Sequence, residues 1–594
     1  MGAMNEYLLP FATRRISARH ARVTATGEPG GIRVRFARRV REPGIVVPAP
    51  GKGWDLSGFT AIAVEVRNLG NTEGAIVCEA GPHSWTDGIA VVAPGTTESL
   101  WILLKRAAYP PKMKARFPGM NGMPGDTVWI WDAPDPAKVP GLRLYAVTEA
   151  IPESIEVSGI RAVRYNTAPE PDPMRRGIFP LADGYGQYRH REWPGKVHGD
   201  LDLAAARDRE DADLRAHPVP PGRDRWGGWA KGPRMRATGH FRTEKAGSRW
   251  WLVDPDGRLF WSHGITCVNA REATRVKGRE RFFGPLPRRG PLAGFRHGDA
   301  FDFYGANLRR KYGERWREEA AARAHRRLRS WGMNTIANWS DRDICGLRRT
   351  PYCINLPYRR VLDSHGFPDM SDAACRAALR EGCRAAARET ANDPWCIGWF
   401  IDNELHWPNV PNLGGLADTY YRVCRDEMKA IAPRKLFLGS RIHMHEYPFG
   451  GSHDVVRAAA RWCDVVSFNR YRFTAADLRL PGGCDKPVII GEWHFGALDR
   501  GMLHTGLRSA GTQAQRGATY GFYLRGALRN PAIVGAHWFQ YHDQCLTGRF
   551  DGENYQIGFL DICDTPYPET IAGARAVGYG MYELRTGSRR QTAL

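Results

Sequence analysis

The sequence predicts a multidomain chain in which an N-terminal β-sandwich of jelly-roll type precedes a C-terminal α/β domain. Two observations support this prediction. Residues 15–166 contain short runs that alternate apolar and polar residues with a period of two, and turn residues separate these runs. Over residues 236–594, short apolar strands alternate with amphipathic helices, which is typical of a parallel α/β domain and fits a (β/α)8 TIM barrel with insertions. A doubly wound sheet is the alternative, but no GxGxxG motif follows the first strand.

The N-terminal strands are predicted from their alternation. Period-two runs cover residues 31–36, 60–67, 99–104 and 155–163, and helical periodicity is largely absent between them. We expect residues 1–14 to be an N-terminal extension. Its first four residues, MGAM, are typical of a cloning remnant in front of a trimmed natural N-terminus.

A change of composition separates the two parts of the chain. Residues 167–173, with the sequence TAPEPDP, indicate a proline-rich linker. The following residues, 174–235, are rich in Pro, Gly, Arg and Trp, and only residues 200–215 have a helical pattern. We therefore expect residues 167–235 to form an ordered connector that packs on the barrel of residues 236–594.

The elements of the α/β domain follow one another in regular order. Helices are predicted over residues 314–331, 371–392 and 416–432, and the first of them ends at a Trp-Gly pair, where glycine is a stop signal. Strands are predicted over residues 259–265, 335–339, 396–402, 436–442, 465–468, 488–490 and 533–538.

The composition excludes several classes of protein. With 42% hydrophobic residues among 594, the chain can build cores, which excludes disorder for most of it. No apolar run approaches the ~18–20 residues of a membrane-spanning helix. The net charge of +22 comes mainly from dispersed arginines, so it favours an anionic substrate over nucleic acid, with genome-driven arginine usage as the alternative. The 12 cysteines form no CxxC pair and match no zinc spacing.

Two glutamates lie where apolar strands end. Glu404 follows residues 397–401 and the pair Asp402-Asn403, and Glu492 follows residues 488–491. Barrel active sites lie at the C-terminal ends of the strands. A single glutamate there is often a salt-bridge partner or a helix cap, whereas two in aromatic surroundings favour a catalytic pair. Such a pair suits glycoside hydrolysis, in which a protonated carboxyl donates to the leaving oxygen and an ionised one attacks the anomeric carbon.

The segments around both glutamates resemble the catalytic motifs of a known family. Residues 399–405 (WFIDNEL) and 491–496 (GEWHFG) are similar to the two motifs of glycoside hydrolase family 50, the β-agarases. They also fit the wider clan of retaining (β/α)8 hydrolases, which have Asn-Glu after strand four and Glu after strand seven. The resemblance covers about residues 180–590, through segments such as 185–188, 303–308, 331–341, 496–502, 534–541, 546–549, 551–554 and 564–569.

The resemblance implies a retaining mechanism with Glu404 as the acid/base and Glu492 as the nucleophile. In a retaining enzyme the two carboxyl groups lie ~5–5.5 Å apart, against ~6.5–9.5 Å in an inverting one. Asn403 is then expected to hold the 2-hydroxyl of the sugar, and Asp402 to support the site without reacting. This chemistry needs no metal and no cofactor, and the histidines within residues 443–446 (HMHE) match no standard zinc motif.

Other strand-end residues are expected to bind substrate. Trp538, at the end of the eighth strand, is the expected platform for the sugar ring, and Asn334 and Trp339, placed after the second strand, are expected to line the same floor. Tyr471 is expected to donate a hydrogen bond to the nucleophile, with packing at the rim as the alternative. The remaining candidates are Asn469, His494, His504, His537 and Gln540.

The family implies a polysaccharide substrate. We expect cleavage of β-1,4-galactosidic bonds in agarose or a related marine galactan, including sulfated forms, with disaccharide release from chain ends. The alternatives are another β-galactoside or an anionic β-glycan and, in a different class, a non-catalytic polysaccharide-binding or nucleic-acid-binding protein. The basic loop of residues 271–289 is a candidate contact for an anionic galactan, with arginine-rich composition as the alternative explanation.

The N-terminal sandwich resembles carbohydrate-binding modules in outline. Trp54, Trp85 and Trp101 are candidate sugar contacts in it, but core packing is the favoured explanation for each of them. We expect no nucleic-acid partner and no membrane span. The expected location is secreted or periplasmic, with no signal peptide visible in the sequence. The oligomeric state stays open.

Overall fold

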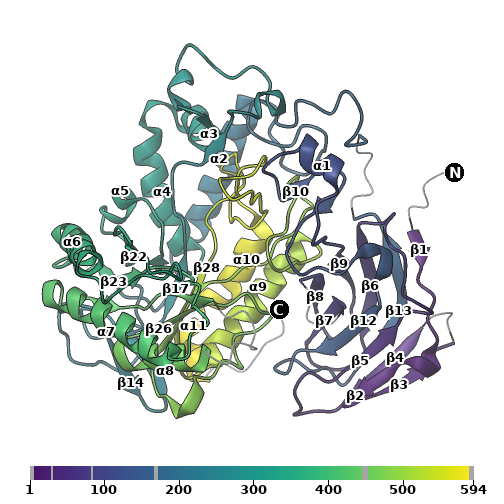
Figure 1. Cartoon of the computed structure of the whole chain (residues 1–594), viewed down its shortest axis with the longest axis horizontal. Coiled ribbons are helices and arrows are strands. Elements are labelled where there is room, and N and C mark those ends of the chain that lie inside the picture. The colour runs from purple at the N-terminus through teal and green to yellow at the C-terminus, as the bar shows by residue number, and fades with distance from the viewer. Residues whose placement is uncertain (1–5, 28–30, 82–84, 166–170, 444–451, 588–594) are drawn as a thin grey trace.

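The protein consists of two bodies that lie side by side (Figure 1). The computed structural model describes residues 6–27, 31–81, 85–165, 171–443 and 452–587. The N-terminal body is built mainly of antiparallel strands, and the C-terminal body is a parallel sheet surrounded by helices. This order of a β part followed by an α/β part is the one that the sequence predicts.

Two antiparallel sheets form the N-terminal body. The first has the strand order β3-β4-β13-β6-β9, with β1 paired to β13, and the second has the order β2-β5-β12-β7-β8. A core of aliphatic side chains from both sheets lies between them, which makes the body a β-sandwich. The strands of the first sheet are β1 (Glu6–Leu8), β3 (Ala21–Ala25), β4 (Ile32–Phe36), β6 (Ala61–Asn68), β9 (Thr97–Leu103) and β13 (Ser154–Val163). Those of the second are β2 (Ser17–Arg19), β5 (Gly44–Pro48), β7 (Gly74–Ala80), β8 (Asp87–Val92) and β12 (Gly141–Ala146).

The four strands predicted in this region all belong to the first sheet. They correspond to β4, β6, β9 and β13, and β4 alternates strictly between buried and exposed residues. In contrast, β7 and β8 are buried along their whole length. A strand that is covered on both faces has apolar residues at nearly every position, so its sequence does not alternate with a period of two.

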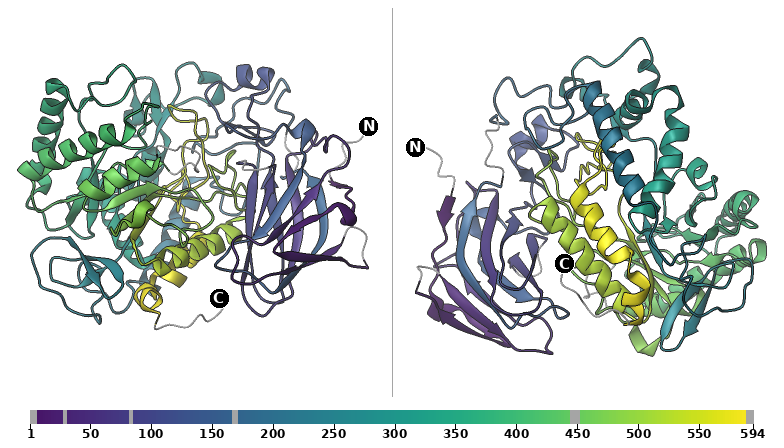
Figure 2. Two further views of the ribbon diagram at one scale, coloured as in Figure 1. Left: turned by 60° about the horizontal axis from the view of Figure 1, so that its bottom comes forward. Right: turned by 180° about the vertical axis from the view of Figure 1, so that it is seen from behind.

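The second sheet is covered on its outer face because it packs on the C-terminal body. Ile89 and Val91 belong to the same buried cluster as Tyr523 on helix α9 (Gln513–Arg529). The backbone N–H of Val91 donates to Oε1 of Gln515 at 3.1 Å. Figure 2 shows α9 beside the sandwich. The two bodies therefore share one hydrophobic core.

A parallel sheet with the strand order β24-β23-β22-β21-β17-β28-β27-β26-β25 forms the centre of the C-terminal body. The two end strands, β24 and β25, are pieces of the single segment 436–443, so the sheet closes on itself into a barrel. The strands are β17 (Ser262–Ile265), β21 (Thr335–Ile336), β22 (Tyr352–Leu356), β23 (Cys396–Ile401), β24 (Leu436–Phe437), β25 (Ile442–His443), β26 (Val466–Asn469), β27 (Val488–Glu492) and β28 (Ile533–Trp538).

Helices cover the outside of the barrel, but the alternation of strands and helices is incomplete. The described residues between β26 and β27 contain only the short 3-10 turn Pro481–Gly483, and those between β21 and β22 contain the one-turn helix α5 (Arg342–Cys345). Besides α9, the longer helices around the barrel are α3 (Phe303–Tyr312), α4 (Trp316–Ser330), α6 (Ala373–Thr390), α7 (Leu413–Ile431), α8 (Ser452–Trp462) and α10 (Pro568–Gly578).

A small antiparallel sheet closes the N-terminal end of the barrel. It consists of β14 (Arg242–Ala246), β15 (Arg249–Val253) and β16 (Leu259–Phe260). Phe260 packs there against Ile397 and Val534, which lie near the starts of their barrel strands. The single strand predicted over residues 259–265 is therefore wrong, because the chain divides at Trp261 between this sheet and β17.

Two other predicted strands are interrupted where the barrel meets its loops. The segment 335–339 is extended only at Thr335–Ile336, and Trp339 has a positive φ of 58°. The segment 436–442 is broken by positive φ values of 76° at Gly439 and 50° at Arg441. These turns redirect the chain at the C-terminal end of the barrel, where the candidate residues lie.

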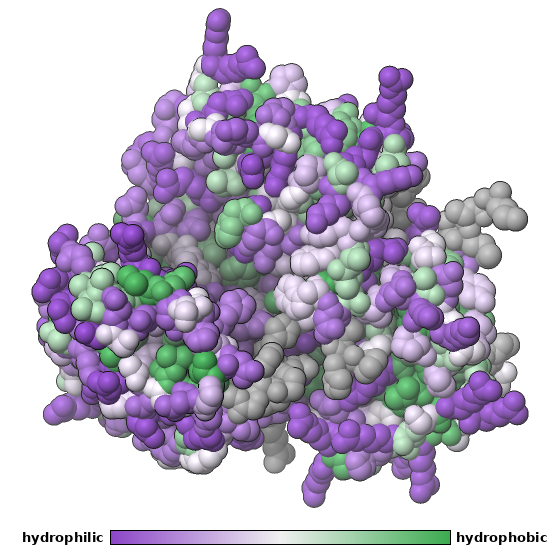
Figure 3. All heavy atoms as spheres, in the orientation of Figure 1, coloured by the Kyte–Doolittle hydropathy of each residue, from purple (hydrophilic) through white to green (hydrophobic). Residues whose placement is uncertain are grey.

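The connector contains helix α2 (Asp200–Ala216), at the place where residues 200–215 have a helical pattern. On the face shown in Figure 3, hydrophilic residues dominate, and hydrophobic residues occur in small separate areas. Among the helices in the described part of the chain, none is long and apolar enough to cross a membrane.

Candidate active site

Two glutamates come together at the C-terminal end of the barrel. Glu492 is the last residue of β27, and Glu404 lies three positions beyond the end of β23. The strand pairing places Asn469, the last residue of β26, opposite Glu492. The Nδ2 group of Asn469 donates to Oε1 of Glu404 at 2.7 Å and to Oδ1 of Asn403 at 3.1 Å. Asn469 therefore ties the ends of β23 and β27 into one site.

Glu492 lies in a closed environment and is 4% exposed. The hydroxyl of Tyr471 donates to its Oε2 at 2.5 Å, and Nη1 of Arg441 lies 3.8 Å from its Oε1. Burial raises the pKa of Glu492 to about 7, and the negative charge of Glu404 adds to the rise. Arg441 and Tyr471 act in the opposite direction, because both stabilise the ionised carboxylate.

Glu404 is held by its backbone as well as by Asn469. It has a positive φ of 47°, and its N–H donates to the carbonyl of Ser440 at 3.2 Å. Its side chain is 31% exposed, and Nε2 of His443 lies 3.8 Å from its Oε1. Burial raises the pKa of Glu404, while the hydrogen bond from Asn469 and the charge of Arg441 oppose that rise. The more open of the two carboxyls is therefore Glu404.

Arg441 is a charged residue of the site that the sequence analysis missed. Its side chain is completely buried, and none of its guanidinium nitrogens has a hydrogen-bond partner among the described residues. The guanidinium lies over the ring of Trp339, 3.8 Å from the ring centroid. A Cβ at Gly491 would come within 2.5 Å of Cδ of Arg441, so the close approach to β27 requires glycine. The only signal in the sequence is an arginine at the end of a barrel strand.

Trp339, which is expected to line the substrate floor, lies beside Arg441 at the site. One face of its ring meets Arg441, its edge meets Phe539 at a centroid distance of 6.1 Å, and the residue is partly exposed. Trp538 is fully buried, donates to the carbonyl of Ile557 at 2.7 Å and packs against Trp493. The prediction that Trp538 is the platform is wrong, because successive strand residues face opposite sides and Trp538 faces the helices.

Asn334 is not part of this site. It precedes β21 and lies at the opposite end of the barrel, where its Nδ2 donates to the carbonyls of Trp261 at 3.0 Å and Gly227 at 3.2 Å. Its Oδ1 accepts the N–H of His263 at 2.9 Å. The prediction that Asn334 lines the substrate floor is therefore wrong, and the residue joins the barrel to its N-terminal cover.

Two of the three histidine candidates, His504 and His537, are buried and bonded to other parts of the protein. Both ring nitrogens of His504 are engaged by backbone groups, at 2.8 Å by the carbonyl of Trp129 and at 2.9 Å by the N–H of Gly506, so His504 is not available to a sugar. His537 bonds Ser262 at 2.8 Å inside the barrel. Burial lowers the pKa of His504 and of His537 to about 3, so both are neutral.

His494 and Gln540 occupy intermediate positions. Nε2 of His494 accepts the N–H of Leu507 at 2.9 Å, and its ring lies 4.7 Å from that of Tyr471. The structure thus places His494 behind the tyrosine that contacts Glu492. Gln540 is 3% exposed and donates to the carbonyl of His542 at 2.9 Å.

Asp402 lies behind Glu404. It is 8% exposed, and its Oδ2 accepts hydrogen bonds from the hydroxyls of Tyr358 and Tyr420, each at 2.7 Å. This arrangement fixes the turn that carries Asn403 and Glu404. It agrees with a supporting position for Asp402.

A third acidic residue near the pair was also missed. Glu553 contributes to raising the pKa of Glu404, and the charge of Glu492 contributes to raising the pKa of Glu553. Nη2 of Arg549 lies 2.6 Å from Oε2 of Glu553. Gln544 donates to the same oxygen at 2.8 Å. The turn that carries these residues presents Phe550, which is 90% exposed. An isolated phenylalanine in the sequence carries no signal that distinguishes it from a core residue.

The sandwich contributes to the wall of the site. The Nζ of Lys105 donates to the carbonyls of Gly506 at 3.2 Å and Leu507 at 3.1 Å, beside the N–H that binds His494. Arg508 forms an ion pair with Asp87 of β8 and donates from Nε to the carbonyl of Tyr471 at 2.8 Å. The loop of residues 504–508 therefore connects the sandwich to Tyr471.

The remaining candidates from the sequence are buried, or they pack against or bond to other parts of the protein. Trp54 is 4% exposed, and Nε1 of the same residue donates to the carbonyl of Pro10 at 3.0 Å. Trp85 is 6% exposed, and Trp101 packs edge-on against Tyr165 at 5.4 Å. In the basic loop, Arg279 binds the carbonyls of residues 547 and 548. Within the described residues, no group of three metal-ligating side chains comes together, and residues 444–446 of the HMHE segment lie outside them.

Comparison with known proteins shows two curated relatives. The chain is 27% identical over 654 residues to β-agarase B of Vibrio sp. (strain JT0107), covering 88% of this chain and 66% of the relative. It is 28% identical over 531 residues to β-agarase A of the same strain, covering 68% of this chain and 52% of the relative. The chain thus spans about half to two thirds of the length of these relatives. No protein-family model matches the chain.

Solved structures resemble the whole chain. An exo-β-agarase superposes with a TM-score of 0.78 at 26% identity and covers 98% of this chain and 100% of its own. The agarase AgWH50C superposes with a TM-score of 0.75 at 27% identity and covers 98% of this chain and 99% of its own. The similarity therefore includes both the sandwich and the barrel.

Proposed function

We propose, from the similarity to the β-agarases over most of the chain, that this chain is a member of glycoside hydrolase family 50 and a retaining hydrolase of agarose. The bonds cleaved are the β-1,4-galactosidic bonds of agarose or a closely related galactan. The observation that carries the proposal is the pair Glu404 and Glu492 at the C-terminal ends of β23 and β27, joined through Asn469 on β26 and buried unequally. Two carboxyls in different surroundings are what an acid and a nucleophile require.

In the first step, Glu492 acts as the nucleophile. One of its oxygens bonds to the anomeric carbon while the bond from that carbon to the leaving oxygen breaks, and Glu404 gives its proton to that oxygen. Tyr471 and Arg441 favour this assignment, because a hydroxyl donor and a cation beside Glu492 stabilise its ionised form. The products of the step are the released sugar and an ester between Glu492 and the galactosyl unit.

In the second step, Glu404 is ionised and acts as a base. It takes a proton from water, the water oxygen bonds to the anomeric carbon, and the ester bond to Glu492 breaks. The configuration at the anomeric carbon is inverted twice and thus retained. Trp339, stacked on Arg441, is the proposed platform for the apolar face of the sugar, and Asn403 is proposed to bind the 2-hydroxyl.

We propose action from chain ends with disaccharide release, because one of the similar structures is described as an exo-β-agarase. A secreted or periplasmic location accompanies this proposal, since a polymeric galactan does not cross a membrane. The net charge of +22 favours a second candidate substrate, a sulfated or carboxylated galactan.

The test compares the native enzyme with Glu492→Gln and Glu404→Gln on agarose, porphyran and carrageenan, native and desulfated. We expect one disaccharide product from agarose, formed with retention of configuration, and a loss of more than about a thousandfold in either variant. Glu318→Gln is the control, because Glu318 is an exposed surface residue paired with Arg315. Cleavage of sulfated galactans alone would shift the substrate to the second candidate, and products that persist in Glu492→Gln would overturn the mechanism.

A further inference from the structure

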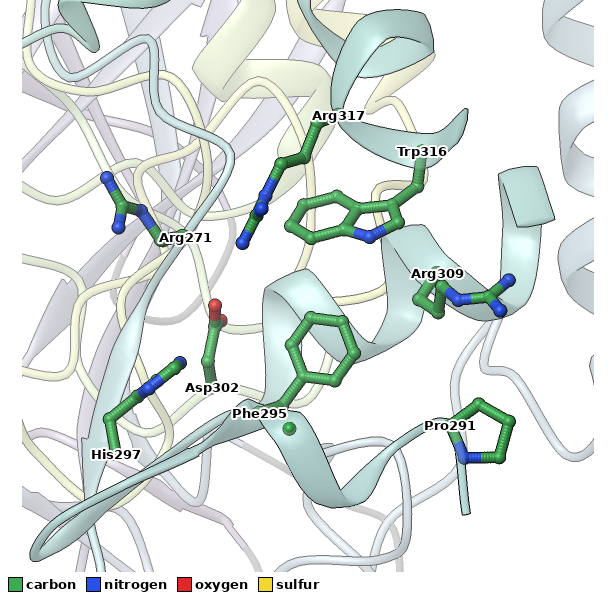
Figure 4. A pocket seen from close by; sticks show the side chains of 9 residues that line it. Arg271, Pro291, Phe295, His297, Asp302, Arg309, Trp316 and Arg317 are labelled. Carbon is green, nitrogen blue, oxygen red and sulfur yellow. The ribbon is translucent and has the colours of Figure 1, made fainter. Parts of the chain in front are cut away.

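A cavity of about 220 Å³ lies outside the site described above. Its wall is formed by the loop that leads from β17 to helix α3 and by the start of helix α4. Figure 4 shows the carboxylate of Asp302, the guanidinium of Arg317, the ring of His297 and the rings of Phe295 and Trp316 around one space. The cavity thus combines an acidic group, basic groups and aromatic edges.

Asp302 is the most informative residue of this cavity. It is 3% exposed, and its Oδ1 accepts the N–H groups of Gly305 at 2.8 Å and Glu272 at 3.1 Å. No hydrogen bond within the described residues uses its Oδ2, and Figure 4 shows the carboxylate directed into the cavity. A carboxylate oxygen with a free acceptor position, on a residue that is otherwise buried, can accept a hydrogen bond from a hydroxyl or another donor.

The basic groups surround this acceptor. The guanidinium of Arg317 lies over the ring of Trp316, 4.8 Å from its centroid, and no ion pair of Arg317 occurs within the described residues. Arg271 reaches the nearest carboxylate, that of Asp341, only at 3.9 Å. These donors face the same space as Asp302, so a ligand there meets an acceptor on one side and donors on the other.

The aromatic side chains supply an apolar surface. Phe295 and Trp316 pack against each other at a centroid distance of 5.4 Å, tilted by 50°. A hexose ring presents hydroxyls at its rim and C–H groups on its faces, which matches polar groups around an aromatic wall. We propose that this cavity binds a hexose unit of a galactan chain, as a second site that holds the polymer beside the catalytic cleft.

The path from the catalytic cleft to the cavity is short along the chain. The N–H of Val268 donates to Oγ of Ser340 at 2.9 Å, and the N–H of Ala270 donates to Oδ2 of Asp341 at 2.9 Å. This segment therefore runs beside Trp339 and continues directly into Arg271, which lines the cavity. A galactan chain that lies on Trp339 has a second contact surface along the same segment.

The inference rests on the proposed function, and its test separates the two. Gly294 lines the cavity, and a Cβ placed there meets no atom within 4 Å, so Gly294→Met fills the space without a clash at the backbone. Gly284 also has open space around a Cβ but does not line the cavity, which makes Gly284→Met the matched control. Asp302→Asn is a second variant, because the amide oxygen retains the cap to Gly305 while the free acceptor becomes a donor.

The variants are first compared for retention on insoluble agarose in the Glu492→Gln background. We expect Gly294→Met and Asp302→Asn to bind about three- to tenfold more weakly than Gly284→Met, the effect of one or two lost hydrogen bonds. In active enzyme, KM on agarose is expected to rise by a similar factor while kcat and the cleavage of a soluble tetrasaccharide stay unchanged. Retention on sulfated galactan distinguishes a hydroxyl contact from a contact between Arg317 and a sulfate group.

Equal retention of Gly294→Met and Gly284→Met on both galactans would overturn the second site. A parallel loss on the polymer and on the tetrasaccharide would also overturn it, since that result assigns the cavity to the fold of the catalytic centre. If the proposed function itself is wrong, the result is distinguishable, because the native enzyme then cleaves none of the galactans.

Discussion

At the scale of single residues, two glutamates of the same type are given different chemistry by their neighbours. Tyr471 and Arg441 contact Glu492, whereas Asn469 is the direct hydrogen-bond donor to Glu404. Burial raises the pKa of both carboxyls. The negative charge of Glu404 adds to the rise at Glu492, because like charges at close range do not ionise together readily. The retaining mechanism requires that Glu404 is protonated while Glu492 is ionised.

The first prediction concerns Tyr471→Phe. The hydroxyl of Tyr471 lowers the pKa of Glu492, so its removal raises that pKa further above about 7. A nucleophile must be ionised, and a raised pKa removes the carboxylate at any pH below it. We expect the acidic limb of kcat/KM to move to higher pH, and kcat/KM at neutral pH to fall roughly tenfold or more.

The measurement is a pH profile of kcat/KM for native enzyme and variant. Native activity is expected to rise as the pH increases through about 7, as Glu492 ionises. Tyr185→Phe is the control, because the hydroxyl of Tyr185 bonds Asp200 in the connector, at 2.9 Å. An acidic limb at the same pH in both enzymes would contradict the assignment of Tyr471.

At the scale of elements, the site depends on loops that are anchored by buried charges. Lys105 is completely buried and reaches two carbonyls of the loop 504–508. Burial lowers the pKa of Lys105 to about 7.

A second group of charges joins α2, α4 and the segment after β28, where Arg327 contacts Glu210 at 2.5 Å and Asp564 at 2.7 Å.

The second prediction is that Lys105→Met reduces activity through the loop. The substitution removes the donors to the carbonyls of Gly506 and Leu507, and the loop then holds His494 and Tyr471 less firmly. We expect kcat/KM to fall about tenfold and hydrogen exchange of residues 504–508 to accelerate. Lys112→Met, at an exposed position, is the control. Unchanged exchange in the loop would show that Lys105 does not anchor it.

The third prediction is that Arg327→Met destabilises the fold. The substitution removes one of the two buried cations beside each of the carboxylates of Glu210 and Asp564, which keep Arg323 and Lys311 respectively. Loss of a buried ion-pair partner costs about 3–5 kcal/mol. Arg326→Met is the control, since the side chain of Arg326 is 51% exposed. Chemical unfolding at neutral pH measures both. A loss as small as that of the control would mean that Lys311, 3.1 Å from Asp564, compensates.

The ion pairs of Asp564 with Arg327 and Lys311 also make the stability of the fold depend on pH. Arg327 and Lys311 lower the pKa of Asp564 below its usual range. Because the pKa of Asp564 is lower in the folded protein than the value of about 3.9 in the unfolded chain, its ionisation stabilises the fold at every pH above about 3.9. This stabilisation is lost only as the pH falls from there toward the lower pKa of the folded protein. This contribution therefore persists in mild acid, and it is expected to be smaller in Arg327→Met, where Lys311 remains beside Asp564.

At the scale of the whole molecule, the sandwich is part of the catalytic body. Its second sheet shares a buried cluster with α9, and Arg525 of α9 pairs with Glu73 beside β7 at 2.5 Å. Apolar surface on the outer face of β7 and β8 has no water contact in this arrangement. Separation of the two bodies would expose it.

The fourth prediction follows from this shared core. Calorimetry of the full chain is expected to show one unfolding transition, because neither body retains its buried face alone. Residues 171–594 produced without the sandwich are expected to aggregate or to lack activity. Two well-separated transitions, or an active isolated barrel, would contradict a shared core. The activity of the full-length protein, measured in parallel, is the control for the assay.

Much of the architecture was predictable from local patterns. Strands with one exposed face, such as β4, show the period-two signal, and Glu404 and Glu492 follow apolar strands that the sequence delimits. The strands β7 and β8 were missed because both of their faces are buried. The split at Trp261 was missed because one continuous apolar run serves two sheets.

The sequence by itself determined the order of the two parts of the chain, the two glutamates and the resemblance to the β-agarases. These features depend on local periodicity and on short motifs. Only the tertiary structure decided that Trp339 lies partly exposed against Arg441 while Trp538 faces the helices. It also decided that Asn334 lies at the other end of the barrel and that Arg441 lies beside Glu492. The physical reason is that the direction and the partners of a buried side chain depend on segments far away in the sequence, whose packing no local pattern records.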